Sequence, residues 1–102
     1  MSKYKVIVSR EAADMLRQHI LFLANVDKLA AHKTREKLID AFYSLQEMPS
    51  RFPFFNDPDL PKNKYHKMYV EKWYLVLYQI KDNTVYIDHI LDCRQEYKWL
   101  IE

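Results

Sequence analysis

Basic side chains and one histidine gather in a short stretch of the chain, residues 62–72. Glu71 is the only carboxylate in this stretch, which holds the following basic residues: Lys62, Lys64, His66, Lys67 and Lys72. Such a run suits an anionic partner, and it is also common on a face that only contacts water. The net charge of +2 is too small to decide between them. The sequence predicts Lys62, Lys64 and Lys72 as nucleic-acid contacts and leaves His66 open between function and packing.

Several kinds of chemistry are excluded by what the chain lacks. It contains no glycine, and therefore no glycine-rich phosphate-binding loop. Its one cysteine, Cys93, and its four histidines have no metal-ligand spacing. His89 lies on the apolar side of a predicted strand, where a core histidine is expected, and nothing near Cys93 resembles a Cys–His nucleophile pair. The sequence predicts no cofactor and no metal.

Length and composition indicate one small domain over residues 1–102. A content of 49% hydrophobic and 15% aromatic residues is enough for a modest core. Cys93 cannot form an internal disulfide, which favours a reducing compartment. The N-terminus lacks the apolar segment of a signal peptide, and no apolar run approaches the length of a membrane span. We therefore expect a cytoplasmic protein without membrane contact.

In the first half of the chain, apolar residues recur at the spacing of a strand and then at the spacing of two helices. Residues 3–8 alternate as a strand with one buried face. Ser9 is the predicted cap of a helix over residues 10–26, and Asp27 caps a second helix that Pro49 ends. The apolar stripe predicted for the first helix consists of Ala12, Leu16, Ile20 and Leu23, widened by Met15, Phe22 and Val26. The stripe predicted for the second helix consists of Leu38, Ala41, Phe42, Leu45 and Met48.

A proline-rich loop follows the second helix. All four prolines fall in it: Pro49, Pro53, Pro58 and Pro61. Three phenylalanines lie inside the same loop: Phe52, Phe54 and Phe55. These rings either hold the loop against the core or form an exposed contact patch for a partner.

Three strands are predicted after the loop, over residues 64–70, 73–80 and 84–91, with a tight turn at Asp82-Asn83. The second of these is apolar on both sides, as a central strand would be. A short helix from Arg94 to Ile101 closes the chain. This order predicts an α+β fold in which a two-helix hairpin packs on one face of a curved, mostly antiparallel four-stranded sheet. We expect the opposite sheet face to be open, basic and aromatic, and to carry the function.

Three stretches of the chain together resemble the RelE/ParE toxin superfamily. They are Tyr4-Lys-Val-Ile-Val-Ser-Arg-Glu-Ala12, Trp73-Tyr-Leu-Val-Leu-Tyr78 and Ile90-Leu-Asp-Cys-Arg-Gln-Glu-Tyr97. Leu45 through Pro49 also fits the way the family ends its second helix. The resemblance covers nearly the whole chain and implies a microbial-ribonuclease-like fold. It further implies a toxin of a type II toxin–antitoxin system, blocked by a cognate antitoxin. Some members cut mRNA in the ribosome, and others poison DNA gyrase.

The resemblance also implies which residues would act in a ribosome-dependent nuclease. Cleavage by the RNA 2′-OH needs a base, cations at the phosphate and a proton donor for the leaving oxygen, and it needs no metal. Arg94 matches the family's terminal arginine and Tyr97 the aromatic that follows, while His66 and Lys67 fall where cationic residues occur. Leu75 stands where active nucleases commonly carry an arginine, a departure compatible with gyrase poisoning.

The sequence thus leaves three functions to be separated. The basic strand, Arg94 and Tyr97 favour an mRNA endonuclease acting on the ribosome, which we place slightly ahead. Leu75 favours the alternative, a gyrase poison without nuclease activity. A third possibility is an inactive relic or a binding module that keeps only the fold.

Overall fold

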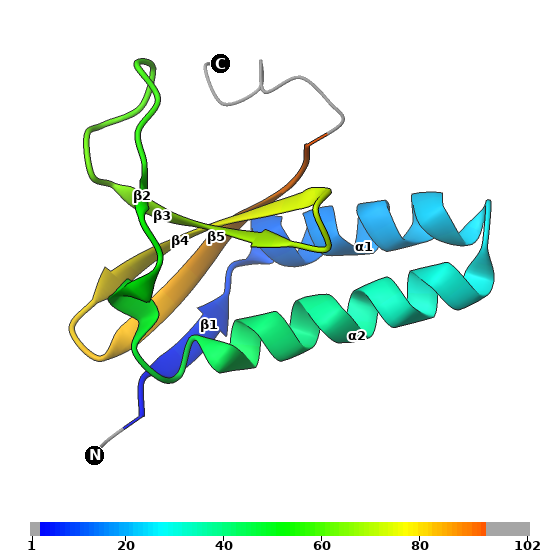
Figure 1. Cartoon of the computed structure of the whole chain (residues 1–102), viewed down its shortest axis with the longest axis horizontal. Coiled ribbons are helices and arrows are strands. Elements are labelled where there is room, and N and C mark those ends of the chain that lie inside the picture. Colours follow the sequence, from blue (N-terminus) through cyan, green and yellow to red (C-terminus); the bar gives the residue numbers. More distant parts are fainter. Residues whose placement is uncertain (1–2, 94–102) are drawn as a thin grey trace.

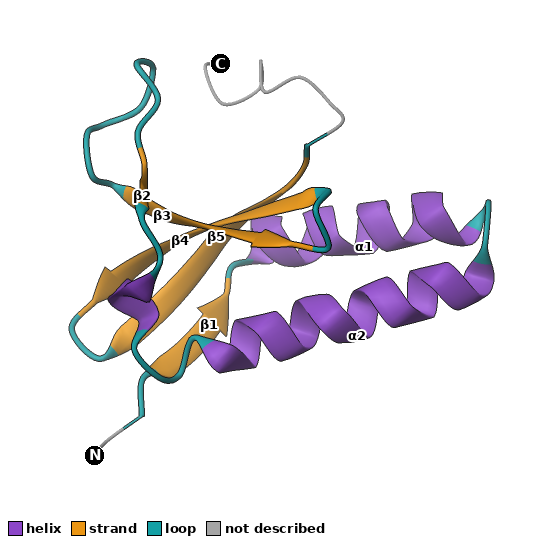
Figure 2. Cartoon of the chain, viewed as in Figure 1, coloured by secondary structure: helices purple, strands orange, loops and turns teal. Residues whose placement is uncertain are grey.

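The computed structural model describes residues 3–93, in which two helices pack on one face of a five-stranded sheet (Figure 1, Figure 2). The elements in chain order are β1 (Lys5–Val8), α1 (Arg10–Ala24), α2 (Lys28–Ser44), the 3-10 helix η1 (Pro49–Arg51), β2 (Phe54–Phe55), β3 (Tyr65–Val70), β4 (Tyr74–Lys81) and β5 (Thr84–Asp92). The predicted short helix from Arg94 to Ile101 lies outside the described residues.

Both helices begin at the predicted capping residues. The Ser9 side chain accepts a hydrogen bond of 3.0 Å from the backbone N–H of Ala12, at the start of α1. The Asp27 carboxylate accepts one of 3.0 Å from the N–H of Ala30, at the start of α2. Each cap satisfies an N–H group that has no partner within its helix. In the part of the chain that the structure describes, neither helix is long and apolar enough to cross a membrane.

The second helix ends earlier than predicted. Its last residue is Ser44, and Pro49 begins η1 instead of ending α2. The guanidinium of Arg51 donates hydrogen bonds to the backbone carbonyl oxygens of Ser44, Glu47 and Met48. Ser44 is the last residue of α2, and Glu47 and Met48 follow the helix, so one arginine side chain joins the end of α2 to the start of η1.

The sheet has five strands, so the prediction of four was wrong. The strand order is β1-β5-β4-β3-β2; β1 runs parallel to β5, and the other neighbours are antiparallel. The additional strand is β2, in which Phe54 pairs with His66 and Phe55 with Tyr65. The sequence pattern hides this strand because it is only two residues long and follows Pro53 directly.

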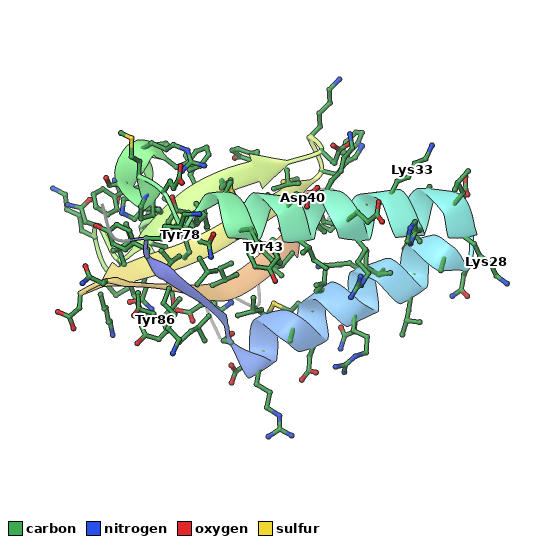
Figure 3. All side chains as sticks on the ribbon, turned by 90° about the horizontal axis from the view of Figure 1, so that it is seen from below. Lys28, Lys33, Asp40, Tyr43, Tyr78 and Tyr86 are labelled. Carbon is green, nitrogen blue, oxygen red and sulfur yellow. The ribbon has the colours of Figure 1, made fainter. Side chains whose placement is uncertain are left out.

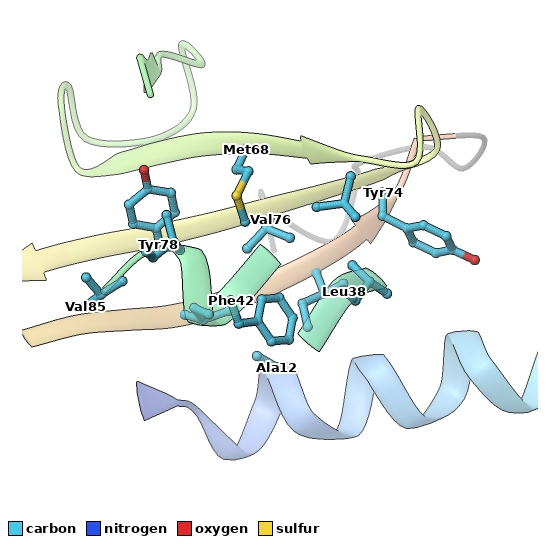
Figure 4. Packing of buried hydrophobic residues seen from close by; sticks show 12 residues of the cluster. Ala12, Leu38, Phe42, Met68, Tyr74, Val76, Tyr78 and Val85 are labelled. Carbon is cyan, nitrogen blue, oxygen red and sulfur yellow. The ribbon is translucent and has the colours of Figure 1, made fainter. Parts of the chain in front are cut away.

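The main core lies between the helices and the sheet (Figure 4). Ala12 of α1 and Leu38 and Phe42 of α2 pack against sheet residues of the same face. The labelled sheet residues in this core are Met68, Tyr74, Val76, Tyr78 and Val85. As predicted for a central strand, β4 is buried on both faces from Tyr74 to Tyr78.

A second, smaller apolar cluster occupies the opposite face of the sheet. It consists of Tyr65, Leu75, Leu77 and Leu91, with Phe55 and Leu60 of the proline-rich segment packed against it. This segment rises on the side of the sheet away from the helices (Figure 1). The face expected to be open is therefore partly covered, because apolar side chains of the loop shield the apolar centre of the sheet from water.

The helical hairpin continues past the end of the sheet (Figure 2). His19 of α1 still contacts the sheet, since its Nε2 donates a hydrogen bond of 2.7 Å to the Ile90 carbonyl oxygen. Farther along, Phe22 is 66% and Val26 78% exposed, so their predicted burial was wrong. Helical spacing places these residues near the core-facing stripe, but burial also requires a strand opposite them.

Candidate functional site

The sequence-predicted site residues on β3 lie on opposite faces of the sheet. His66 shares the helix-covered face with Met68 and Tyr78, which belong to the main core. Lys67 lies on the other face, because successive residues of a strand point to opposite sides. We name this second side the outer face and define it by Tyr65, Lys67, Tyr69, Leu75, Leu77 and His89. His66 and Lys67 therefore do not meet at one site.

His66 is held in place by contacts that leave it little freedom. Its side chain is buried, and its Nδ1 donates a hydrogen bond of 2.8 Å to the Phe52 carbonyl oxygen. Its ring stacks on Tyr78, with centroids 5.2 Å apart and planes 16° apart, and contacts the tilted ring of Phe54, with centroids 4.2 Å apart. The imidazole thus joins the proline-rich segment to the sheet.

Lys67 belongs to a row of side chains that crosses three strands on the outer face. It pairs with Leu77 of β4, and Leu77 pairs with His89 of β5. The Tyr65 ring meets the His89 ring edge-on at 5.4 Å, and Lys64 Nζ lies 5.2 Å from the centre of the Tyr65 ring. Burial is the main cause that lowers the pKa of His89, which keeps its imidazole neutral at physiological pH.

The remaining predicted contacts do not form one basic cluster. Lys62 and Lys64 precede β3, whereas Lys72 lies in the turn after it. Because a strand rises by about 3.3 Å per residue, Lys64 and Val70 are roughly 20 Å apart. Lys72 and the preceding Glu71 both have a left-handed backbone, with φ of 66° and 55°. Arg94 and Tyr97 lie outside the described residues.

The centre of the outer face is apolar. Leu75 lies there with 1% of its surface exposed and pairs with Tyr69 on β3 and Leu91 on β5. Leu77, next to it on the same face, is fully buried. The sequence identified Leu75 as a departure from nuclease members of the superfamily, and the structure shows that no solvent-accessible side chain occupies this position. Within residues 3–93, no cluster of His, Cys, Asp or Glu could hold a metal ion.

Comparison with known families shows to which family the chain belongs. The model of the family described as "ParE toxin of type II toxin-antitoxin system, parDE" matches residues 6–97. The chain belongs to the ParE toxin family. This confirms the resemblance to the RelE/ParE superfamily and places the chain on the ParE side of it.

A solved structure supports the same fold. A chain of the chromosomal ParDE toxin–antitoxin system from P. aeruginosa is similar, with a TM-score of 0.74 and 15% sequence identity. The match covers 88% of the present chain and 96% of that chain. No curated protein matches the sequence. At this identity the likeness shows the fold alone. Any conclusion about how this ParE family member acts must therefore rest on its own side chains.

One feature of this ParE family member was not predicted from the sequence. Large apolar residues lie exposed at the turn between α1 and α2, and Trp73, at the β3–β4 turn, is half exposed. The helical spacing of Phe22 and Val26 indicated burial. Only the length of the hairpin relative to the strands could have revealed their exposure.

Proposed function

We propose that the chain is the toxin of a toxin–antitoxin pair and that it poisons DNA gyrase without cleaving RNA. The observation that carries this proposal is Leu75, a buried apolar side chain at the centre of the outer face. A nuclease of this superfamily would present an arginine there. The loss of one contact that stabilises transition-state charge costs roughly 3–4 kcal/mol. Membership of the ParE family supports the same choice.

The placement of the other predicted catalytic residues agrees with this proposal. The His66 imidazole is engaged by Phe52, Phe54 and Tyr78 on the helix-covered face. Lys67 faces the opposite side, next to the apolar pair Leu75 and Leu77. His66 and Lys67, the predicted base and cation, are therefore separated by the sheet.

A ribosome-dependent nuclease is the second candidate, and one observation favours it. His89 lies on the same face and in the same row as Lys67, and its lowered pKa provides the neutral imidazole that a general base needs. In that case Lys67 and Arg94 would neutralise the phosphate. An inactive relic of the fold would have neither activity.

We expect the partner of the toxin to be an antitoxin encoded beside it. Its acidic segment, with apolar anchors, would cover the outer face around Lys67 and Tyr69. Phe52 and Phe55 already pack within the chain, whereas Phe54 is 41% exposed and available to a partner. Hydrogen exchange on the complex would test this placement. Unchanged protection of residues 64–78 after the antitoxin binds would contradict it.

Two activity assays on one preparation separate the candidates. Induced expression should stop growth, and co-expression of the adjacent gene should restore it. With purified protein, we expect gyrase to accumulate cleaved DNA complexes while translation in a cell extract continues. Cleavage of mRNA on programmed ribosomes, with gyrase unaffected, would instead establish the nuclease. Normal growth at high expression of folded protein, with no signal in either assay, would indicate the relic.

A further inference from the structure

A cavity of about 1070 Å³ lies where the end of α2 meets η1 and the segment that leads into β1. Its apolar lining consists of Tyr4 before β1, Tyr43 in the last turn of α2, and Met48 and Pro49 at the start of η1. A concave volume of this size, lined by aromatic and apolar side chains, is typical of sites that hold small molecules. The cavity shares no residue with the outer face.

The frame of this cavity is fixed by hydrogen bonds within the chain. The Arg51 guanidinium donates to the carbonyl oxygens of Ser44 and Met48, at 3.3 and 3.2 Å, and to the Ser44 hydroxyl at 3.0 Å. The Tyr4 N–H donates a hydrogen bond of 2.9 Å to the Gln46 carbonyl oxygen, which joins the start of the sheet to the segment after α2. Because these bonds preorganise the lining, a ligand would order few groups on binding, which lowers the entropy that binding costs.

Two large side chains of the lining are exposed to solvent. Tyr43 is 62% and Met48 73% exposed. Tyr43 projects from the last turn of α2 (Figure 3), and Tyr4 is partly buried against the main core. An aromatic ring packs well against a second ring, and a thioether sulfur packs against the edge of one. Tyr4, Tyr43 and Met48 together therefore suit a ligand that is itself a flat ring.

The backbone of Met48 is strained in a way that contacts within the fold do not explain. Its φ of 47° and ψ of 54° are left-handed, a conformation that glycine adopts at lower cost. Among residues 3–93, the side chains at the other positions of positive φ are all polar: Asn63, Glu71, Lys72 and Asp82. Met48 is apolar, and most of its side chain contacts solvent. Since strain of this kind concentrates where a ligand is held, Met48 indicates a contact with another molecule.

The charged groups in the lining are already engaged. Lys3 Nζ lies 3.9 Å from Glu47 Oε1, and the Arg51 guanidinium binds the C-terminal end of α2, where the helix dipole is negative. The cavity therefore does not select a charged ligand. We infer that it binds a small, uncharged molecule with a planar aromatic ring, held against Tyr43 and Met48. The inference does not depend on the proposed function, because the cavity and the outer face involve different residues.

Indole is the probe, because it is uncharged, planar and small enough for the cavity. Two controls are of similar size: cyclohexanol is uncharged but not planar, and benzoate is planar but charged. We expect indole to shift the amide resonances of Tyr4 and of residues 43–51 of the full chain, with shifts that saturate. Each control should bind at least about fivefold more weakly, since it lacks the aromatic ring or carries a charge that must be desolvated.

Variants of the protein identify the contact. Tyr43→Ala should weaken indole binding by about threefold or more. Tyr69→Ala, which removes a similarly exposed tyrosine from the outer face, should leave the affinity unchanged. Met48→Gly should weaken binding as Tyr43→Ala does, and it should raise the melting temperature by about 2–5 °C because glycine accepts a left-handed backbone.

Three results would overturn the inference. The first is equal binding of indole and cyclohexanol, and the second is an unchanged affinity for indole in folded Tyr43→Ala. The third is self-association of the chain that Tyr43→Ala abolishes, because the cavity would then be part of an interface between two copies. A lower melting temperature of Met48→Gly would show that the Met48 side chain stabilises the fold itself, against its assignment to the ligand. Tyr43→Ala decides the outcome if Met48→Gly does not fold.

Discussion

The hydroxyl of Tyr78 donates a hydrogen bond of 2.5 Å to the carbonyl oxygen of Pro49. Tyr78 is fully buried in the centre of β4, and Pro49 is the first residue of η1. A single side chain therefore ties the segment after α2 to the middle of the sheet. The same ring stacks on His66, which holds Phe52 of that segment by its Nδ1.

The first prediction concerns this hydrogen bond. Tyr78→Phe keeps the ring but leaves the buried Pro49 carbonyl without its donor, which should lower the free energy of unfolding by about 1–3 kcal/mol. Urea unfolding measures the change. Tyr43→Phe, at an exposed position on α2, is the matched control and should change it by less than about 0.5 kcal/mol. Equal values for the two variants would show that the bond contributes nothing.

The ionisation of Tyr78 gives a second prediction, at high pH. Burial is the main cause that raises its pKa from 10.0 to about 12. The unfolded chain therefore releases this proton first, and the stability from the neutral tyrosine is complete below pH 10 and is lost as the pH rises towards 12. Unfolding measured across this window should show a smaller decline in Tyr78→Phe than in the wild type. Identical slopes would contradict the assignment to Tyr78.

His89 should make the free energy of unfolding depend on pH in the acidic range. Its folded pKa lies below the ordinary value of 6.5, mainly because burial disfavours the imidazolium. Below pH 6.5 the unfolded chain binds the proton more readily, so the free energy of unfolding falls as the pH decreases through the folded pKa. His89→Asn should flatten this dependence below pH 6.5. An unchanged slope in folded His89→Asn would contradict the assignment to His89.

Arg51 should stabilise the end of α2 through its fork of donors. Arg51→Ala removes its hydrogen bonds to the carbonyls of Ser44, Glu47 and Met48. Because the site is exposed, we expect the free energy of unfolding, measured by thermal unfolding, to fall by only about 1 kcal/mol. Arg51→Lys should recover less than half of it, since an ammonium cannot reach three carbonyls in the same geometry. Full recovery would mean that charge alone, acting on the helix dipole, is responsible.

The two faces of β3 make His66 and Lys67 separable by mutation. His66→Ala removes a buried, stacked ring and should cost about 2–4 kcal/mol of stability, whereas Lys67→Ala should cost less than about 0.5. If the chain is a gyrase poison, folded Lys67→Ala and Arg94→Ala proteins should still produce cleaved DNA complexes. A fall of mRNA cleavage by about 10²-fold in these variants would support the nuclease instead.

The sequence by itself determined where the helices begin, which strand is central and the family. Ser9 and Asp27 cap the helices as predicted, because capping depends on a side chain and a backbone N–H three residues away. The apolar run from Tyr74 to Tyr78 predicted a central strand correctly, because burial on both faces requires apolar residues at successive positions. Leu75 was also recognised from the sequence as a departure from the nuclease members of the superfamily, and the structure buries it at the centre of the outer face.

The tertiary structure decided what depends on distant partners. Strand β2 exists because Phe54 and Phe55 find a free edge beside His66 and Tyr65. His66 became part of the core through contacts with Phe52 and Tyr78, far apart in the chain. Phe22 has the spacing of a buried residue and is exposed, because the strands end before the hairpin does. Periodicity gives the direction of a side chain, but only the assembled sheet determines whether anything lies in that direction.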